Sequence, residues 1–128
     1  MLDRAHRLTG SRAFSDALRR GARARSDTVV VHLAPPVDDE SDGNAADRPA
    51  RLGLVVGKAV GRAVTRNHVK RRLRHLARER LASLPGGSML VIRALPEASS
   101  ASTVTLASDL DRALDRAVRR LSAQGGHR

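Results

Sequence analysis

The stretch Gly61–Arg74, GRAVTRNHVKRRLR, holds the residues of this chain that are best suited to bind an anion. Five of the nine residues from position 66 to position 74 are cationic, namely Arg66, Lys70, Arg71, Arg72 and Arg74. Like charges at this density repel one another unless an anion neutralises them. Arginine presents a planar fork of N–H donors that pairs with two phosphate oxygens. The stretch therefore predicts phosphate binding.

Helical spacing would separate these residues into faces. A helix from about Thr65 to Leu84, ended by Pro-Gly-Gly, has one cationic sector about 100° wide that holds Asn67, Lys70, Arg71, Arg74 and Arg78. Val69, Leu73 and Leu76 fall on the far side, where they would dock onto a sheet. A third, mixed flank holds His68, Arg72, His75 and Glu79. The helix is thus expected to bury one stripe and to present a cationic ridge on another.

The segment before this helix also suits an anion. Gly57 and Gly61 flank Lys58, so the entry loop can approach a phosphate backbone closely. The N-terminus of the helix adds unpaired N–H groups and the positive end of the helix dipole.

The overall charge agrees with a polyanionic partner. Lys and Arg number 24 against 13 Asp and Glu, which gives a net charge of +11, and Lys58 and Lys70 are the only lysines. A body this basic indicates binding to nucleic acid, the alternative being a highly charged but merely solvated surface. The chain has no Trp or Tyr and one Phe, which disfavours a stacking platform for single strands. Phosphate and sugar contacts are expected to dominate.

Several other chemistries are disfavoured. There is no cysteine, which excludes thiolate chemistry and suits a reducing compartment. Asp38, Glu40 and Asp42 resemble the start of a Ca²⁺ loop, but its twelfth position, where Glu is required, is Pro49. The histidines lack metal-site spacing. No apolar run suits a signal peptide or a membrane span, so we expect a cytoplasmic protein with no membrane association.

The remaining pattern predicts an α+β domain whose helices cover one sheet. Helices are expected at Ser11–Gly21, in the basic stretch, and at 108–126; strands at Thr28–Ala34, Arg51–Gly57 and Ser88–Leu95, with a short edge strand possible in 22–26. Residues 96–104 are expected to form a loop. The order is α-β-β-α-β-α, or α-β-β-β-α-β-α with the edge strand. The acidic segment 35–50 is expected to be a disordered surface loop.

The basic stretch resembles the signature G-x-A-V-x-R-N-x-x-K-R-x-x-R of the protein subunit of bacterial ribonuclease P. The matching residues are Gly61, Ala63, Val64, Arg66, Asn67, Lys70, Arg71 and Arg74. HRLTGSRAF, RLGLVVGKAVG and VIRALP resemble further parts of the family, so the likeness covers nearly the whole chain. His68 departs from the family by replacing a basic residue, Ala59 replaces a lysine, and the acidic loop is long.

The resemblance implies a fold and a function. The fold would be one domain over residues 1–128, a two-layer sandwich with a four-stranded sheet and a left-handed β-α-β crossover, like domain 2 of ribosomal protein S5. The protein would be the cofactor of a catalytic RNA that removes the 5′ leader from precursor tRNA, with no obligate protein partner. Mg²⁺ would be held mainly by the RNA and none by the protein alone, which would contribute no catalytic residue.

The resemblance also implies two groups of binding residues. Those facing the catalytic RNA would be Arg62, Arg66, Asn67, His68, Lys70, Arg71 and Arg74. Those lining a cleft for the single-stranded leader would be Phe14, Leu18, His32 and Lys58. Leu18 and His32 stand where other members carry aromatic residues, and the spacing of Phe14 fits a core residue equally well. A ribosomal-type or general RNA-binding chaperone is the alternative function, and a DNA-binding module is less favoured because no helix-turn-helix pattern is visible.

Overall fold

The computed structural model describes residue 19 and residues 21–35 and 47–125 of the 128-residue chain. The expected first helix, with Phe14 and Leu18, lies outside the described residues, apart from Arg19 and Gly21, as does most of the acidic segment. Asp47–Ala50 are described, and Ala50 is buried while Asp47 is exposed.

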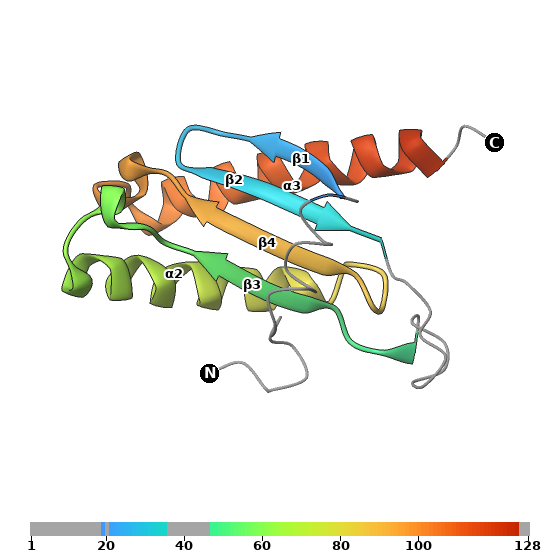
Figure 1. Cartoon of the computed structure of the whole chain (residues 1–128), viewed down its shortest axis with the longest axis horizontal. Helices are drawn as coiled ribbons and strands as arrows, with labels where there is room; N and C mark the ends of the chain where they lie inside the picture. Colours follow the sequence, from blue (N-terminus) through green and yellow to red (C-terminus); the bar gives the residue numbers. More distant parts are fainter. Residues whose placement is uncertain (1–18, 20, 36–46, 126–128) are drawn as a thin grey trace.

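Four strands form one mixed sheet (Figure 1): β1 (Ala22–Arg25), β2 (Val29–Ala34), β3 (Arg51–Val55) and β4 (Met89–Ala94), in the order β1-β2-β4-β3. β1 and β4 each pair antiparallel with β2, and β3 pairs parallel with β4. All four were expected from runs of alternating or β-branched residues, and β1 confirms the short edge strand.

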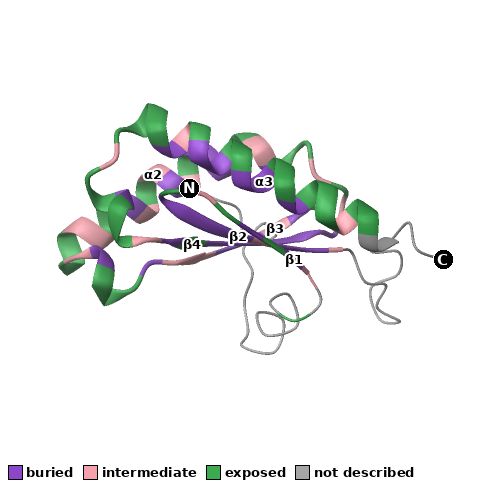
Figure 2. Cartoon of the chain, turned by 90° about the horizontal axis from the view of Figure 1, so that it is seen from above, coloured by how far each residue is buried: buried purple, intermediate pink, exposed green. Residues whose placement is uncertain are grey.

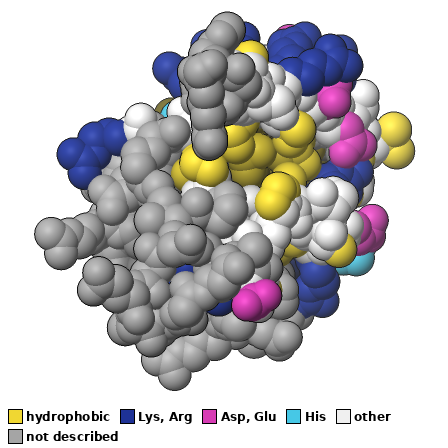
Figure 3. All heavy atoms as spheres, turned by 90° about the vertical axis from the view of Figure 1, so that its right-hand side faces the viewer, with side chains coloured by type: hydrophobic (Ala, Val, Ile, Leu, Met, Phe, Trp, Pro, Cys, Tyr) yellow, Lys and Arg dark blue, Asp and Glu magenta, His cyan; other side chains and the backbone are white. Residues whose placement is uncertain are grey.

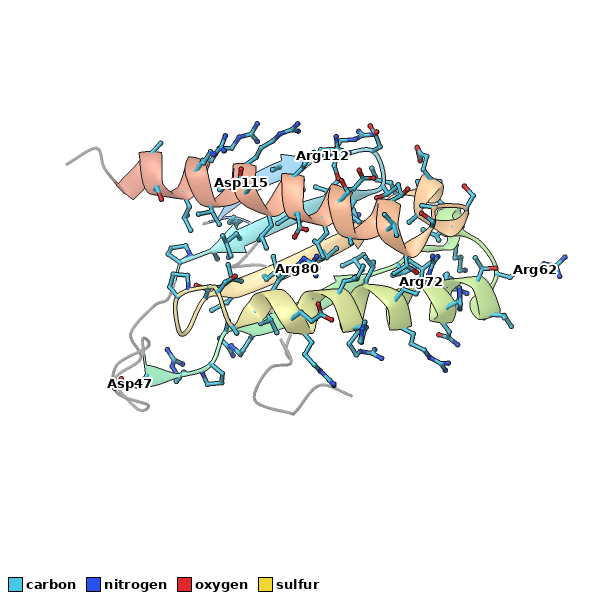
Figure 4. All side chains as sticks on the ribbon, turned by 180° about the vertical axis from the view of Figure 1, so that it is seen from behind. Asp47, Arg62, Arg72, Arg80, Arg112 and Asp115 are labelled. Carbon is cyan, nitrogen blue, oxygen red and sulfur yellow. The ribbon has the colours of Figure 1, made fainter. Side chains whose placement is uncertain are left out.

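Two long helices cover the same face of the sheet (Figure 2): α2 (Ala63–Leu81) and α3 (Thr103–Gly125). α3 packs on β1 and β2, and α2 packs on β3. β3 leads through α2 into β4, its parallel neighbour. In Figure 4 the helices face the reader, and turning the view until β3 and β4 point upward places β4 on the left. The crossover is therefore left-handed, as the resemblance implies and against the usual right-handed rule.

The core lies between the sheet and the helices. Val29, Val31 and Leu33 of β2 point into it, as their alternation predicts, and belong to the same buried cluster as Leu73 of α2 and Leu110 of α3. A smaller buried cluster of Ala34, Met89 and Val91 occupies the opposite face of the sheet. The strands β2 and β4 are thus buried on both faces, which explains their nearly continuous apolar sequences.

Both helices differ from their expected limits. α2 begins two residues early and ends at Leu81 rather than Leu84, because Ser83 and Leu84 turn back to bond the carbonyls of Arg80 and Leu81. α3 begins at Thr103, five residues before the expected start, and a short 3₁₀ helix, η4 (Pro96–Ser99), occupies part of the expected loop. The Ser102 hydroxyl accepts a hydrogen bond of 3.1 Å from the Thr105 N–H, so Ser102 caps α3.

Figure 3 shows hydrophobic side chains gathered at the end of the molecule where α2 terminates. A recess of about 220 Å³ lies between α3 and the residues that follow α2, and its lining is mixed: Leu84, Leu114 and Val118 are apolar, and Ser83, Asp111 and Asp115 are polar. Within the described part of the chain, neither helix combines the length and apolarity that crossing a lipid bilayer requires.

Candidate RNA interface

Five cationic residues of α2 and Asn67 form one solvent-facing surface, which we call the basic ridge: Arg66, Asn67, Lys70, Arg71, Arg74 and Arg78. Asn67, Arg71 and Arg78 are exposed, and the others are partly exposed. On the opposite side of α2, Val69 and Leu73 are 0% exposed and belong to the core. The predicted division of the helix into an apolar stripe and a cationic ridge is confirmed.

Within the part of the chain that the structure describes, no carboxylate neutralises the positive charge of the basic ridge. Among the described residues, the ion pairs of the two helices use other side chains, and no carboxylate pairs with a ridge residue. The first turn of α2 also contains no acid. Glu79 pairs instead with His75 at 3.5 Å, on the mixed flank of the helix. Unpaired arginines at this density favour an external polyanion.

Exposed basic residues lead into α2, so a phosphate backbone can approach them. Lys58 lies in the 3₁₀ turn η3 (Lys58–Val60), and both Lys58 and Arg62 are exposed. Arg62 is the N-cap of α2 but makes no side-chain cap bond, so the first N–H groups of the helix stay available. Gly61 has φ +151°, and a Cβ there would lie 3.0 Å from the Thr65 side chain, so this turn requires glycine.

Two arginines of α2 have structural partners instead (Figure 4). Arg72 Nη1 and Nη2 donate to the carbonyls of Ala101 and Ala98, at 2.8 and 3.3 Å. Arg80 donates to both carboxylate oxygens of Asp111 on α3, at 2.5 and 3.0 Å. Sequence reasoning placed Arg72 on a mixed flank and could not identify these partners, which lie 26 to 31 residues away. The only indication in the sequence that Arg72 has a structural role is its position outside the cationic sector of the helix.

The ion pair between Arg80 of α2 and Asp111 of α3 shifts the pKa of both residues. The hydrogen bond from Arg80 holds the pKa of Asp111 below its ordinary value, although partial desolvation opposes the shift. The same bond raises the pKa of the Arg80 guanidinium. Both side chains therefore stay charged and hold the two helices together.

His32 lies on the face of the sheet away from the helices. It is half-buried and opposes Arg23 across the β1–β2 pair. Burial lowers the pKa of His32, and the charges of Arg23 and Arg93 lower it further. A neutral imidazole in this cationic setting can donate one hydrogen bond and accept another. This face therefore combines a neutral polar group with two guanidinium groups.

The structure separates the predicted site residues into two places. Arg62, Arg66, Asn67, His68, Lys70, Arg71 and Arg74 all belong to α2 or its N-cap, and His68 is exposed. Lys58 lies beside them at the approach to α2, whereas His32 lies on β2, separated from β3 by β4. Phe14 and Leu18 lie outside the described residues. Of the four residues of the predicted leader cleft, the structure thus describes only His32 and Lys58, and the cleft itself stays a prediction.

The carboxylates of α3 do not fit a metal site. Asp109 accepts from Thr28 Oγ1 at 2.8 Å and pairs with Arg112. Asp111 and Asp115 pair with Arg80 and Arg119. Within the residues that the structure describes, no three His, Asp or Glu side chains converge as metal ligands would.

Comparisons with known proteins agree on one family. A family model described as Ribonuclease P matches residues 2–118. A Nocardioides protein is 55% identical over 116 residues, covering 89% of this chain and 92% of the relative. A Streptomyces avermitilis protein is 51% identical over 116 residues, covering 91% of this chain and 94% of the relative. Both are named "Ribonuclease P protein component".

Solved structures agree on the fold. The RNase P protein from Staphylococcus aureus has a TM-score of 0.71 at 21% identity, covering 88% of this chain and 94% of that one. The RNase P protein from Thermotoga maritima has a TM-score of 0.68 at 25% identity, covering 86% of this chain and 96% of that one. The mixed sheet with helices on one face is the fold of these proteins. The chain belongs to the ribonuclease P protein family.

Proposed function

We propose that the basic ridge of α2 binds the catalytic RNA of ribonuclease P, and that the protein assists this RNA in removing the 5′ leader from precursor tRNA. The proposal rests on family membership and on one structural observation. Arginine and lysine side chains occupy one exposed face of α2 without intramolecular carboxylate partners among the described residues. Such a surface would neutralise phosphates that folding of a large RNA brings close together.

Mg²⁺ would belong to the RNA in this scheme. Phosphodiester cleavage by two metal ions needs converging carboxylates or phosphate oxygens as ligands. The α3 carboxylates are already committed to arginine or threonine partners, so they offer no such site. The protein would lower the Mg²⁺ requirement of the RNA by supplying fixed positive charge, and would cut nothing by itself.

The leader would cross the face of the sheet that carries His32. Arg23 and Arg93 on this face could contact phosphates, while the neutral imidazole of His32 hydrogen-bonds a base or a sugar. Lys58 would contact a phosphate near the start of α2. Phe14 and Leu18 would also line the leader site, and their inclusion rests on the family resemblance alone.

Binding measurements with substituted ridge residues test the proposal. Arg66→Gln and Arg71→Gln should each weaken binding to the catalytic RNA and lower the slope of log Kd against log salt by about 0.7–0.9, the release expected per phosphate contact. Arg119→Gln is the matched control, because it removes one exposed charge from α3 at a residue paired with Asp115. Equal effects of all three substitutions would show that net charge, and not the ridge, drives binding.

The alternative of a general RNA-binding chaperone makes a different prediction for RNA captured from cells. A ribonuclease P protein should enrich one catalytic RNA together with precursor tRNA. A chaperone or ribosomal-type protein should recover ribosomal or mixed RNA. The second outcome would contradict the proposed function.

A further inference from the structure

A second row of arginines lies on the edge of the molecule formed by β1 and α3. Arg112, Arg116 and Arg120 follow one another at intervals of four residues along α3, so their Cα atoms lie about 6 Å apart along one side of the helix. All three are exposed. The strand order places β1 and β3 at opposite edges of the sheet, so this row and the basic ridge lie on opposite sides of the molecule.

The structure holds these three side chains in place. Arg116 Nη1 donates to the carbonyl of Arg25 at 2.9 Å, and Arg120 donates to the carbonyl of Arg23. Arg112 pairs with Asp109, which is 1% exposed. A buried carboxylate and two strand carbonyls thus orient the row, and Figure 4 shows Arg112 on the side of α3 away from α2.

Protection of the edge strand β1 uses only part of the hydrogen-bonding capacity of Arg116 and Arg120. β1 is an edge strand, and arginines that bond its outward carbonyls shield it from pairing with other strands. A guanidinium has five N–H donors, and Arg116 and Arg120 each use one of them for this purpose. Both side chains are exposed, so their positive charge and their other donors are accessible to a further partner.

A recess lies at the start of this row. It has a volume of about 290 Å³ and is lined by Arg25, Ser26, Asp27, Arg112 and Arg116. Arg112 and Arg116 of the row line it together with Arg25 and Ser26, and Asp27 is the one acidic residue in the lining. The recess therefore favours an anion, and Asp27 opposes it.

We infer that the β1–α3 edge is a second phosphate-binding surface, which takes the backbone of a segment of the catalytic RNA other than the segment bound by the basic ridge. This inference rests on the proposed function. The described residues include no Phe, Tyr or Trp, so the contacts are to phosphate and not to stacked bases. The row lies in the helical layer, like the basic ridge, whereas His32 points to the opposite face, so the row serves the catalytic RNA and not the leader.

Charge substitutions that preserve the local hydrogen bonds test this surface. The double variant Arg112→Gln, Arg116→Gln keeps N–H donors for Asp109 and for the Arg25 carbonyl but removes two charges. We expect Kd for the catalytic RNA to rise about tenfold and the salt slope to fall by about 1.4–1.8, with an unchanged circular dichroism spectrum. Asp27→Asn should tighten binding. The control Arg119→Gln should change Kd less than twofold.

The same measurement separates this inference from the proposed function. If the ridge variants weaken binding and the edge variants leave both Kd and slope unchanged, the second surface does not exist while the proposed function stands. If neither set has an effect, the proposed function itself fails. An effect of the edge variants on binding of precursor tRNA to the assembled enzyme, with no effect on the catalytic RNA, would overturn the choice of partner.

Tethered hydroxyl-radical cleavage locates the two RNA segments directly. The chain has no cysteine, so Ser108→Cys on α3 and Val64→Cys on α2 each provide one attachment point for an iron chelate. Both positions are exposed, and Ser108 lies one helical turn before Arg112. We expect the two probes to cut different segments of the catalytic RNA. Absence of cuts from position 108, while position 64 gives cuts, would overturn the inference.

Discussion

Arg71 and Arg72 are neighbours in the sequence but should have opposite roles, which a pair of alanine substitutions can reveal. Arg72 makes two charge-assisted hydrogen bonds to carbonyls of the segment that joins β4 to α3, and Ala98, one of the acceptors, is fully buried. A hydrogen bond to a charged group contributes about 1.5–3 kcal/mol. Because Arg72 is partly exposed and one bond is long, we expect a total loss of about 2–3 kcal/mol for Arg72→Ala.

For a domain of this length, such a loss lowers Tm by about 6–12 °C in thermal unfolding followed by circular dichroism. Arg71 is exposed and has no carboxylate partner among the described residues, so Arg71→Ala should leave Tm within about 2 °C. RNA binding at 15 °C below the lower Tm should show the reverse order, with Arg71→Ala weakened and Arg72→Ala close to wild type. Arg72→Lys keeps the charge but lacks the two guanidinium nitrogens that reach the two carbonyls, so its Tm should lie between those of wild type and Arg72→Ala. An unchanged Tm for Arg72→Ala, or equal losses of RNA affinity, would refute this division of roles.

Three further predictions concern stability. Leu73→Ala removes a side chain with 0% exposure and should cost about 2–5 kcal/mol in urea unfolding, without changing RNA affinity at low temperature. Asp111→Asn should cost about 0.5–1 kcal/mol at pH 7; because pairing with Arg80 lowers the pKa of Asp111 in the folded state, this difference should vanish as the pH falls well below 3.8. The folded state also lowers the pKa of His32, so the unfolded chain binds that proton first and stability should fall as the pH drops below 6.5; His32→Gln should reduce this loss.

The strands and the faces of α2 could be predicted because each is determined by local periodicity. Alternation in β2 identifies Val31 as a core residue, and helical spacing identifies Val69 and Leu73. The predicted start of α3 at residue 108 is wrong, because Ser102 is one of several hydroxyl residues in a polar segment. Only the structure shows which of them caps the helix.

Tertiary partners of arginine could not be predicted. Arg72, Arg80 and Arg116 have the same side chain as the arginines of the basic ridge, and what distinguishes them is a carbonyl or carboxylate far along the chain. The handedness of the β3–α2–β4 crossover came from the family resemblance, because the usual rule predicts the opposite hand. Charge and periodicity therefore predict that a basic surface exists, and packing decides which arginines belong to it.

Reconstituted cleavage tests the central claim most directly. Catalytic RNA of ribonuclease P and precursor tRNA are mixed at a Mg²⁺ concentration too low for the RNA alone, with wild-type protein or with the triple variant Arg66→Gln, Lys70→Gln, Arg71→Gln, whose fold is checked by Tm. We predict that wild-type protein restores removal of the leader, that the triple variant does not, and that protein without RNA cuts nothing. Full restoration by the triple variant, or cleavage by protein alone, would contradict the account.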